Sequence, residues 1–183
     1  CPTIIETETD ALQAVDQMKA AGVNAAVVYL GNFGPEGPLT IFAQKLGVPF
    51  MMCAAAEESA RTLIDGRGDA YCGLLNASIN CGLRQLRPHL AVMPVGLPPA
   101  IAAQIAHFVD VARVVVGIRQ LKTFSFGPRP QDFYACNAPI KPLYDLGIEV
   151  MENSELDMYV LFQSMAGKDR KSTRLNSSHT SVS

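Results

Sequence analysis

The residues best suited to contact a ligand are Asn32 and Glu36, which lie in a loop rich in glycine and proline. This loop follows the apolar run AAVVYL at 25–30, a composition typical of a strand buried on both faces of a parallel sheet. Open α/β sheets bind ligands beyond the carboxyl ends of their strands, and amide and carboxylate groups can hydrogen-bond to hydroxyl-rich molecules such as sugars. We therefore predict that both residues contact substrate. The alternative is a tight turn with a solvated glutamate, and the sequence favours neither.

A second rigid loop, at 126–134, holds Arg129 between two prolines. The prolines restrict the backbone and hold the guanidinium in a defined place, where Asp132 could pair with it. Because rigid loops at strand ends often carry binding residues, we predict that Arg129 also contacts substrate. The alternative is a stiff connector with an ordinary ion pair. Glu152 follows a later strand, where the start of a helix favours a structural role.

Signatures of several common enzyme classes do not occur in the sequence. The GRG turn at 66–68 lacks the third glycine of a dinucleotide fingerprint, because Tyr71 occupies that place, and it follows a predicted helix instead of a strand. There is no GxxxxGK[ST] loop, GxSxG elbow or HExxH helix. His89 and His107 have no carboxylate or histidine spaced to share a metal with them, which favours structural roles.

Hydrophobic patterning predicts an α/β fold in which strands and helices alternate. The expected strands lie at 25–30, 48–53, 90–95, 122–126 and 148–151. The expected helices lie at 10–22, 39–46, 57–64, 69–87, 98–121 and 139–146, and a last helix follows Ser154. Such alternation is typical of a mostly parallel sheet with helices on both faces, in a three-layer Rossmann-like or flavodoxin-like arrangement.

Two local features refine this prediction. Thr9 or Asp10 is expected to cap the first helix, and Asp69 the fourth. The large apolar residues of the 69–87 helix are expected to share one face, and they are Leu74, Leu75, Ile79, Leu83 and Leu86.

The chain is expected to hold one domain and the start of another. Residues 1–118 are predicted to form an N-terminal α/β domain that lacks its first strand, because residues 1–5 are similar to a strand end. Residues 119–166 are predicted to begin a central α/β domain. The polar, Ser/Thr-rich residues 167–183 cannot bury enough apolar surface to become ordered. We predict that they are a disordered tail, and their resemblance to translated vector sequence indicates that they are not native.

Composition indicates which kinds of partner the protein can bind and in which cell compartment it lies. The chain has 15 basic and 17 acidic residues, and without 168–183 it has 11 basic and 16 acidic residues, a net charge of −5. A nucleic-acid surface usually needs a basic patch, so we expect no nucleic-acid partner. No uninterrupted apolar run reaches the roughly 20 residues of a membrane span, so we expect no membrane partner. Five cysteines without CxxC spacing favour reduced thiols in a cytoplasmic protein.

Three segments resemble the L-fucose isomerase and L-arabinose isomerase superfamily, and especially its fucose-isomerase-like proteins. They read AAVVYLGNFGPEGP, DAYCGLLNASINCGLRQLRPHL and TFSFGPRPQDFYACNAPIKPLYDLGIEVMENSELD, and the resemblance covers about residues 1–166. It implies that the chain holds the N-terminal domain and part of the central domain of a metal-dependent aldose–ketose isomerase of carbohydrate metabolism.

The resemblance also implies how the chemistry is divided along the sequence. Family members use a divalent metal, typically Mn²⁺, which polarises the sugar while acidic groups move a proton between C1 and C2. The family's metal ligands lie in later segments, so the fragment is expected to bind no metal, to hold no catalytic residue and to be inactive. Asn32, Glu36 and Arg129 are the expected contacts to the sugar substrate, and the full-length parent is expected to be a homo-oligomer.

Two other classes of protein stay open. One is a sugar-binding or regulatory α/β domain without catalysis, similar to half of a periplasmic binding protein. The other is a nucleotide-binding flavodoxin-like domain, which the lack of a phosphate-binding loop disfavours.

Overall fold

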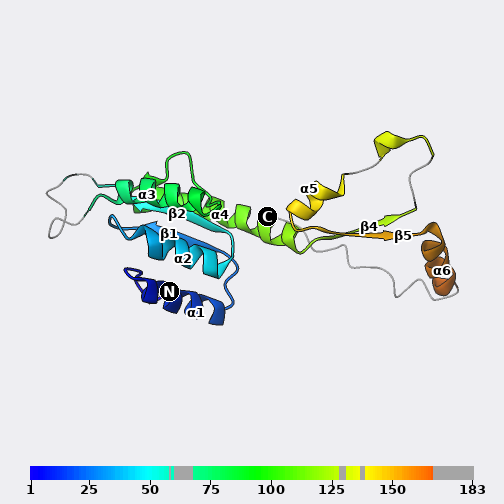
Figure 1. Cartoon of the computed structure of the whole chain (residues 1–183), viewed down its shortest axis with the longest axis horizontal. Coiled ribbons are helices and arrows are strands. Elements are labelled where there is room, and N and C mark those ends of the chain that lie inside the picture. Colours follow the sequence, from blue (N-terminus) through cyan, green and yellow to red (C-terminus); the bar gives the residue numbers. More distant parts are fainter. Residues whose placement is uncertain (58, 60–67, 128–130, 137–138, 167–183) are drawn as a thin grey trace. The chain divides into compact units, whose positions relative to one another are not determined.

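The structure of the protein, a computed structural model, describes residues 1–57, 59, 68–127, 131–136 and 139–166. The chain divides into two compact units, Cys1–Ile118 and Arg119–Ser183, and each is described by itself (Figure 1). Helices alternate with parallel strands in both units, which confirms the prediction of an α/β fold.

The first unit is built around a small parallel sheet. Its described elements are α1 (Glu8–Ala20), β1 (Ala26–Leu30), α2 (Glu36–Leu46), β2 (Phe50–Ala55), α3 (Ala70–Leu83), β3 (Val95–Gly96) and α4 (Pro98–Arg119). The strands lie in the order β1-β2-β3, so β2 pairs with β1 on one side and with β3 on the other. In the register of this sheet Ala26 lies opposite Phe50, and Ala54 lies opposite Val95. The carboxyl ends of the strands therefore meet at one edge.

Helices cover both faces of this sheet, as predicted. Strand side chains alternate between the two faces, so β2 contributes to two cores. Met52 and Ala54 pack with residues of α1, α2 and α3 in the larger core. Met51 and Cys53 pack with α4 in the smaller core. In Figure 1, α1, α2 and α3 lie side by side in one row, with α3 at its end.

The start of α1 is fixed by a capping box. The Thr7 hydroxyl accepts a hydrogen bond from the Asp10 backbone N–H, and the Asp10 carboxylate accepts one from the Thr7 N–H over 2.8 Å. The predicted cap, Thr9 or Asp10, is therefore wrong. Asp10 lies at the third helical position and completes a box that Thr7 begins.

The strand expected at 90–95 is reduced to the two residues of β3. Pro94 has no backbone N–H, and it takes part in the sheet only through its carbonyl, which accepts a hydrogen bond from Ala54 N over 2.8 Å. Before it, His89 forms an isolated parallel bridge with Met51. The His89 ring also stacks on Phe108, with ring centroids 5.5 Å apart. This packing contact gives His89 a structural role.

The helix expected at 69–87 ends at Leu83, and its faces differ from the prediction. Gln85 has a φ of +57°, which no α-helix continues through. Of the five residues predicted to share a face, Leu74 is buried and Leu86 packs partly buried against the larger core, but three are exposed: Leu75, Ile79 and Leu83. Most of the predicted helix at 57–64 and most of the turn at 65–68 lie outside the described residues.

Helix α4 is a 22-residue helix that is long and apolar enough to cross a membrane by length and composition alone. A helix that covers the sheet of a soluble protein meets the same criterion, so the criterion by itself is weak support for a span. Ile101, Phe108 and Ala112 of α4 are buried against the sheet, and this packing accounts for one apolar face of the helix. The exposed part of the helix carries the ion pair of Arg113 with Asp110, and also the apolar residues Val109 and Val114.

The described part of the second unit is a two-stranded parallel sheet with short helices. Its elements are β4 (Lys122–Phe126), the 3₁₀ turn η3 (Tyr134–Cys136), α5 (Ile140–Asp145), β5 (Glu149–Asn153) and α6 (Glu155–Met165). Lys122 lies opposite Glu149 in the register of the pair. Ser154 caps α6 as predicted, in a capping box that Asp157 completes.

Candidate functional site

The candidate site lies where the loops after β1 and β2 meet the start of α3, at the carboxyl edge of the sheet. The loop after β1 packs directly on α3 at Gly73. A Cβ atom at Gly73 would lie 2.7 Å from the carbonyl carbon of Phe33 and 2.9 Å from its Cα. Only glycine permits so close an approach between a helix and the backbone of another segment.

Asn32 fastens this loop to the segment that leads into α3. Its Oδ1 accepts hydrogen bonds from the backbone N–H of Phe33 over 2.8 Å and of Gly68 over 2.9 Å. The Phe33 N–H also donates to the Gly68 carbonyl over 3.0 Å. The two loops are therefore joined by a small set of backbone and side-chain hydrogen bonds centred on Asn32.

Glu57 holds the start of α3 from the loop after β2. Its Oε1 accepts a hydrogen bond from the Ala70 N–H over 2.9 Å. Asp69 occupies the cap position as predicted, but it has a φ of +64° and its side chain makes no capping bond. Glu57, which is distant in the sequence, thus accepts the capping hydrogen bond that Asp69 was expected to accept. It also places a negative charge at the positive end of the helix dipole.

Glu36 lies in the first turn of α2, where its carboxylate accepts a hydrogen bond from the Asn80 side-chain amide of α3. Asn80 Nδ2 also lies 3.3 Å from the carbonyl oxygen of Asn76, one turn earlier in α3. The partly buried Glu36 carboxylate therefore bridges two neighbouring helices. Sequence reasoning missed Asn80, because no local pattern indicates which helix packs beside α2.

A cleft of about 560 Å³ opens beside the loop, between β1 and the residues that precede α1. The polar side chains that border it are Thr3, Glu6, Tyr29 and Asn32. Much of the remaining lining is apolar and includes Ile4, Leu39 and Phe42. Apolar walls with a few polar groups are typical of small-molecule sites. The structure thus places Asn32 at the cleft, but Glu36 is not among the lining residues.

Arg129, the third predicted substrate contact, lies outside the described residues. Asp132, its suggested partner, is described and has a φ of +66°. Of the three predicted residues, the structure brings Asn32 and Glu36 into one loop and helix start, and their substrate role stays a prediction.

The described residues contain no group of three or more His, Cys, Asp or Glu side chains that could hold a metal ion. All five cysteines are free thiols, and burial raises the pKa of Cys53 and of Cys81. These two thiols belong to the two cores and do not face the loop site.

Comparison with known protein families identifies a match to one family. A family model described as the N-terminal domain of fucose/sulfoquinovose isomerase matches residues 1–119. A comparison with curated proteins found no match for the chain. The matched region contains the whole first unit, including the loop site and the cleft.

Proposed function

Because the chain belongs to the family of fucose/sulfoquinovose isomerase N-terminal domains, we propose that it is part of a metal-dependent aldose–ketose isomerase of the cytoplasm. The observation that supports this most is the family match over residues 1–119, which includes the loop site. Both sugars in the family description are six-carbon sugars altered at C6, and we propose a substrate of this class.

Within that enzyme, we assign a supporting role to this part of the chain. The oxygen acceptors of its loop site already hold other parts of the fold together. Asn32 joins two loops, Glu57 caps α3 and Glu36 bridges two helices. Groups engaged in this way can position a neighbouring surface, but they are poorly placed to move protons during a reaction.

The metal of the proposed reaction does not fit the described residues. Mn²⁺ prefers carboxylate, imidazole and water ligands, and these residues contain no suitable cluster. We propose that the ligands lie in other segments of the parent enzyme, that the parent is a homo-oligomer, and that this chain alone does not catalyse the isomerisation.

A second candidate function is sugar binding without catalysis, and the cleft of about 560 Å³ favours it. Its size suits a monosaccharide, and Asn32, Tyr29 and Glu6 could supply hydrogen bonds to hydroxyl groups. In the isomerase, the same cleft would be a place for substrate-side contacts.

The test incubates the purified 183-residue chain with Mn²⁺ and either L-fucose or sulfoquinovose, and measures the ketose formed. We expect no ketose above a metal-free control, and turnover above that control would contradict the supporting role. Binding of the same sugars is measured by calorimetry with the chain and with its Tyr29→Phe variant. Binding that weakens when the Tyr29 hydroxyl is removed would favour the second candidate.

A further inference from the structure

Helix α3 has two faces of opposite character. Toward the core it presents mainly small residues, and they are Ala70, Gly73, Leu74, Ala77 and Cys81. Toward solvent it presents a stripe of large residues at a constant spacing of four. Their exposed fractions are 55% for Tyr71, 48% for Leu75, 62% for Ile79 and 78% for Leu83. We refer to these four residues as the α3 stripe.

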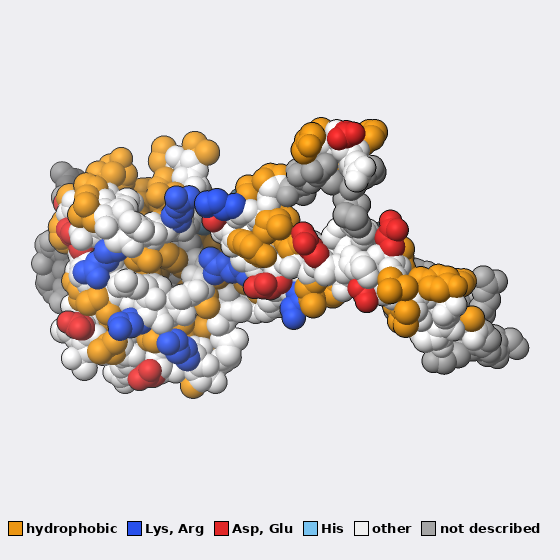
Figure 2. Space-filling model, turned by 45° about the vertical axis from the view of Figure 1, so that its right-hand side comes forward, with side chains coloured by type: hydrophobic (Ala, Val, Ile, Leu, Met, Phe, Trp, Pro, Cys, Tyr) orange, Lys and Arg blue, Asp and Glu red, His pale blue; other side chains and the backbone are white. Residues whose placement is uncertain are grey.

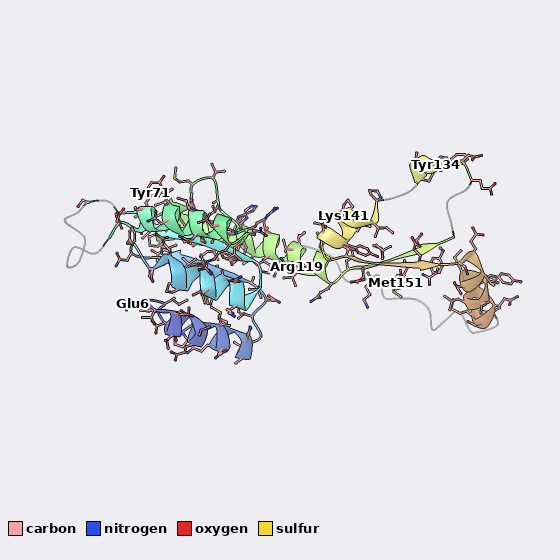
Figure 3. The ribbon with its side chains drawn as sticks, viewed as in Figure 1. Glu6, Tyr71, Arg119, Tyr134, Lys141 and Met151 are labelled. Carbon is pink, nitrogen blue, oxygen red and sulfur yellow. The ribbon has the colours of Figure 1, made fainter. Side chains whose placement is uncertain are left out.

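The α3 stripe lies at the open end of the helix row. Helix α2 packs on one side of α3, and among the described residues no further helix of this row lies beyond α3 (Figure 1). Figure 3 shows Tyr71 at this outer side, and Figure 2 shows hydrophobic side chains gathered along the same upper edge of the first unit. Exposed, contiguous apolar patches often mark contact sites.

Charge along α3 is confined to its two ends. The sequence from Ala70 to Leu83 contains no acidic or basic residue. An exposed Asp69 precedes it, and the exposed Arg84 and Arg87 follow it. None of these three charges takes part in an ion pair among the described residues. The helix itself is thus uncharged, with a negative residue before its first turn and two positive residues after its last.

We propose that the α3 stripe is the contact surface for a second copy of this chain, with the two α3 helices packed antiparallel across a two-fold axis. The stripe is symmetric about position 77, so Tyr71 would lie opposite Leu83 of the second copy, and Leu75 opposite Ile79. A two-fold axis requires such self-complementarity, because the same patch must serve both partners.

The end charges select the antiparallel direction. In this direction Asp69 of each copy lies near Arg84 and Arg87 of the other, and the two helix dipoles are opposed. A parallel pair would instead bring two aspartates together at one end and four arginines together at the other. The contact would continue the row of helices from one copy into the next.

The test measures the mass of the full 183-residue chain in solution by sedimentation equilibrium. Protein concentrations run from about 1 μM to about 500 μM, because interfaces of small area often have dissociation constants in this range. We expect a concentration-dependent dimer. Ile79→Lys places a charge at the centre of the stripe and should raise the dissociation constant at least tenfold, as for a central contact residue. The matched control is Val114→Lys on α4, which is 60% exposed and should leave the dimer unchanged. Circular dichroism checks that both variants are folded.

The charges are tested on their own. Arg84→Glu together with Arg87→Glu should weaken the dimer, because both ends then become acidic. Adding Asp69→Asn should restore part of the affinity by removing the repulsion, and asparagine tolerates the positive φ at this position.

A monomer throughout the concentration range would overturn the proposal and would indicate that the stripe is covered by another segment of a longer polypeptide. Equal weakening by the Val114 control would also overturn it, as would an effect of Arg84 and Arg87 that Asp69→Asn does not relieve. The test measures mass alone, so its outcome does not depend on the proposed isomerase function.

Discussion

Replacing Gly73 by alanine tests whether the loop after β1 is held against α3 as closely as the structure indicates. The added Cβ would lie 2.7 Å and 2.9 Å from backbone carbons of Phe33, against about 3.5–4.0 Å for an ordinary carbon–carbon contact. The Phe33 carbonyl oxygen would lie closer still, so the loop would have to retreat by more than about 1 Å, and a backbone segment cannot rotate away as a side chain can. The retreat would also strain the hydrogen bonds that join Asn32 and Phe33 of this loop to Gly68.

The expected magnitude follows from two opposing terms. Overpacking costs about 1–3 kcal/mol, and we expect the upper end because backbone must move. Alanine in place of glycine inside a helix returns about 1 kcal/mol. The net loss in the free energy of unfolding should therefore be about 2 kcal/mol, equivalent to a fall of about 8 °C in Tm.

Gly82 provides a matched control in the same helix. A Cβ at Gly82 would meet no atom within 4 Å. Gly82→Ala should therefore stabilise the protein by about 0.5–1 kcal/mol. Both variants are compared with the unchanged chain by urea unfolding followed by circular dichroism. If Gly73→Ala is as stable as the unchanged chain, or if Gly82→Ala loses as much, the close packing of loop and helix is wrong.

Two further predictions concern hydrogen bonds to side-chain oxygens. Asn32→Ala should lower the free energy of unfolding by about 1 kcal/mol, because two backbone donors lose their acceptor, whereas Asn32→Asp keeps the acceptor and should stay close to the unchanged chain in urea unfolding. Hydrogen bonds from the side chain and backbone of Thr7 lower the pKa of Asp10 below 3.8. This stabilisation is complete above the unfolded-state pKa and is lost as the pH falls through the lower folded-state pKa. Unfolding measured from pH 6 to pH 2 should therefore show a smaller loss of stability below about pH 4 in Asp10→Asn than in the unchanged chain. Identical pH profiles would show that the capping box does not form.

The sequence predicted the framework of the fold well where the signal is local. The apolar run at 25–30 predicted β1 to within one residue. The expectation that this strand is buried on both faces was wrong, because β1 lies at an edge of the described sheet and Tyr29 is about half exposed. The start of α4 at Pro98 was equally clear, because proline is favoured in the first turn of a helix. The start of α1 could also have been found, since Thr7 and Asp10 have the spacing of a capping box.

The remaining features depend on contacts between distant segments. Nothing local in the sequence indicates that Gly73 lies under the Phe33 backbone, or that Glu57 reaches Ala70 across a loop. The faces of α3 were misjudged for a related reason. Its small residues face the core because α2 and the sheet lie close, and its large residues face outward, which is the reverse of the usual pattern. The predicted substrate role of Asn32 and Glu36 rested on their place after a strand, a place that a structural role explains equally well.

The sequential order of the strands has a consequence for how the protein is made. Among the described strands of the first unit, β2 pairs with β1 and β3 pairs with β2, so this sheet can grow in the order in which the ribosome releases it. Neither β2 nor β3 has to wait for a partner that is synthesised later, which limits the time that apolar edges stay unpaired. The first unit can therefore begin to fold while the polypeptide behind it is still being translated.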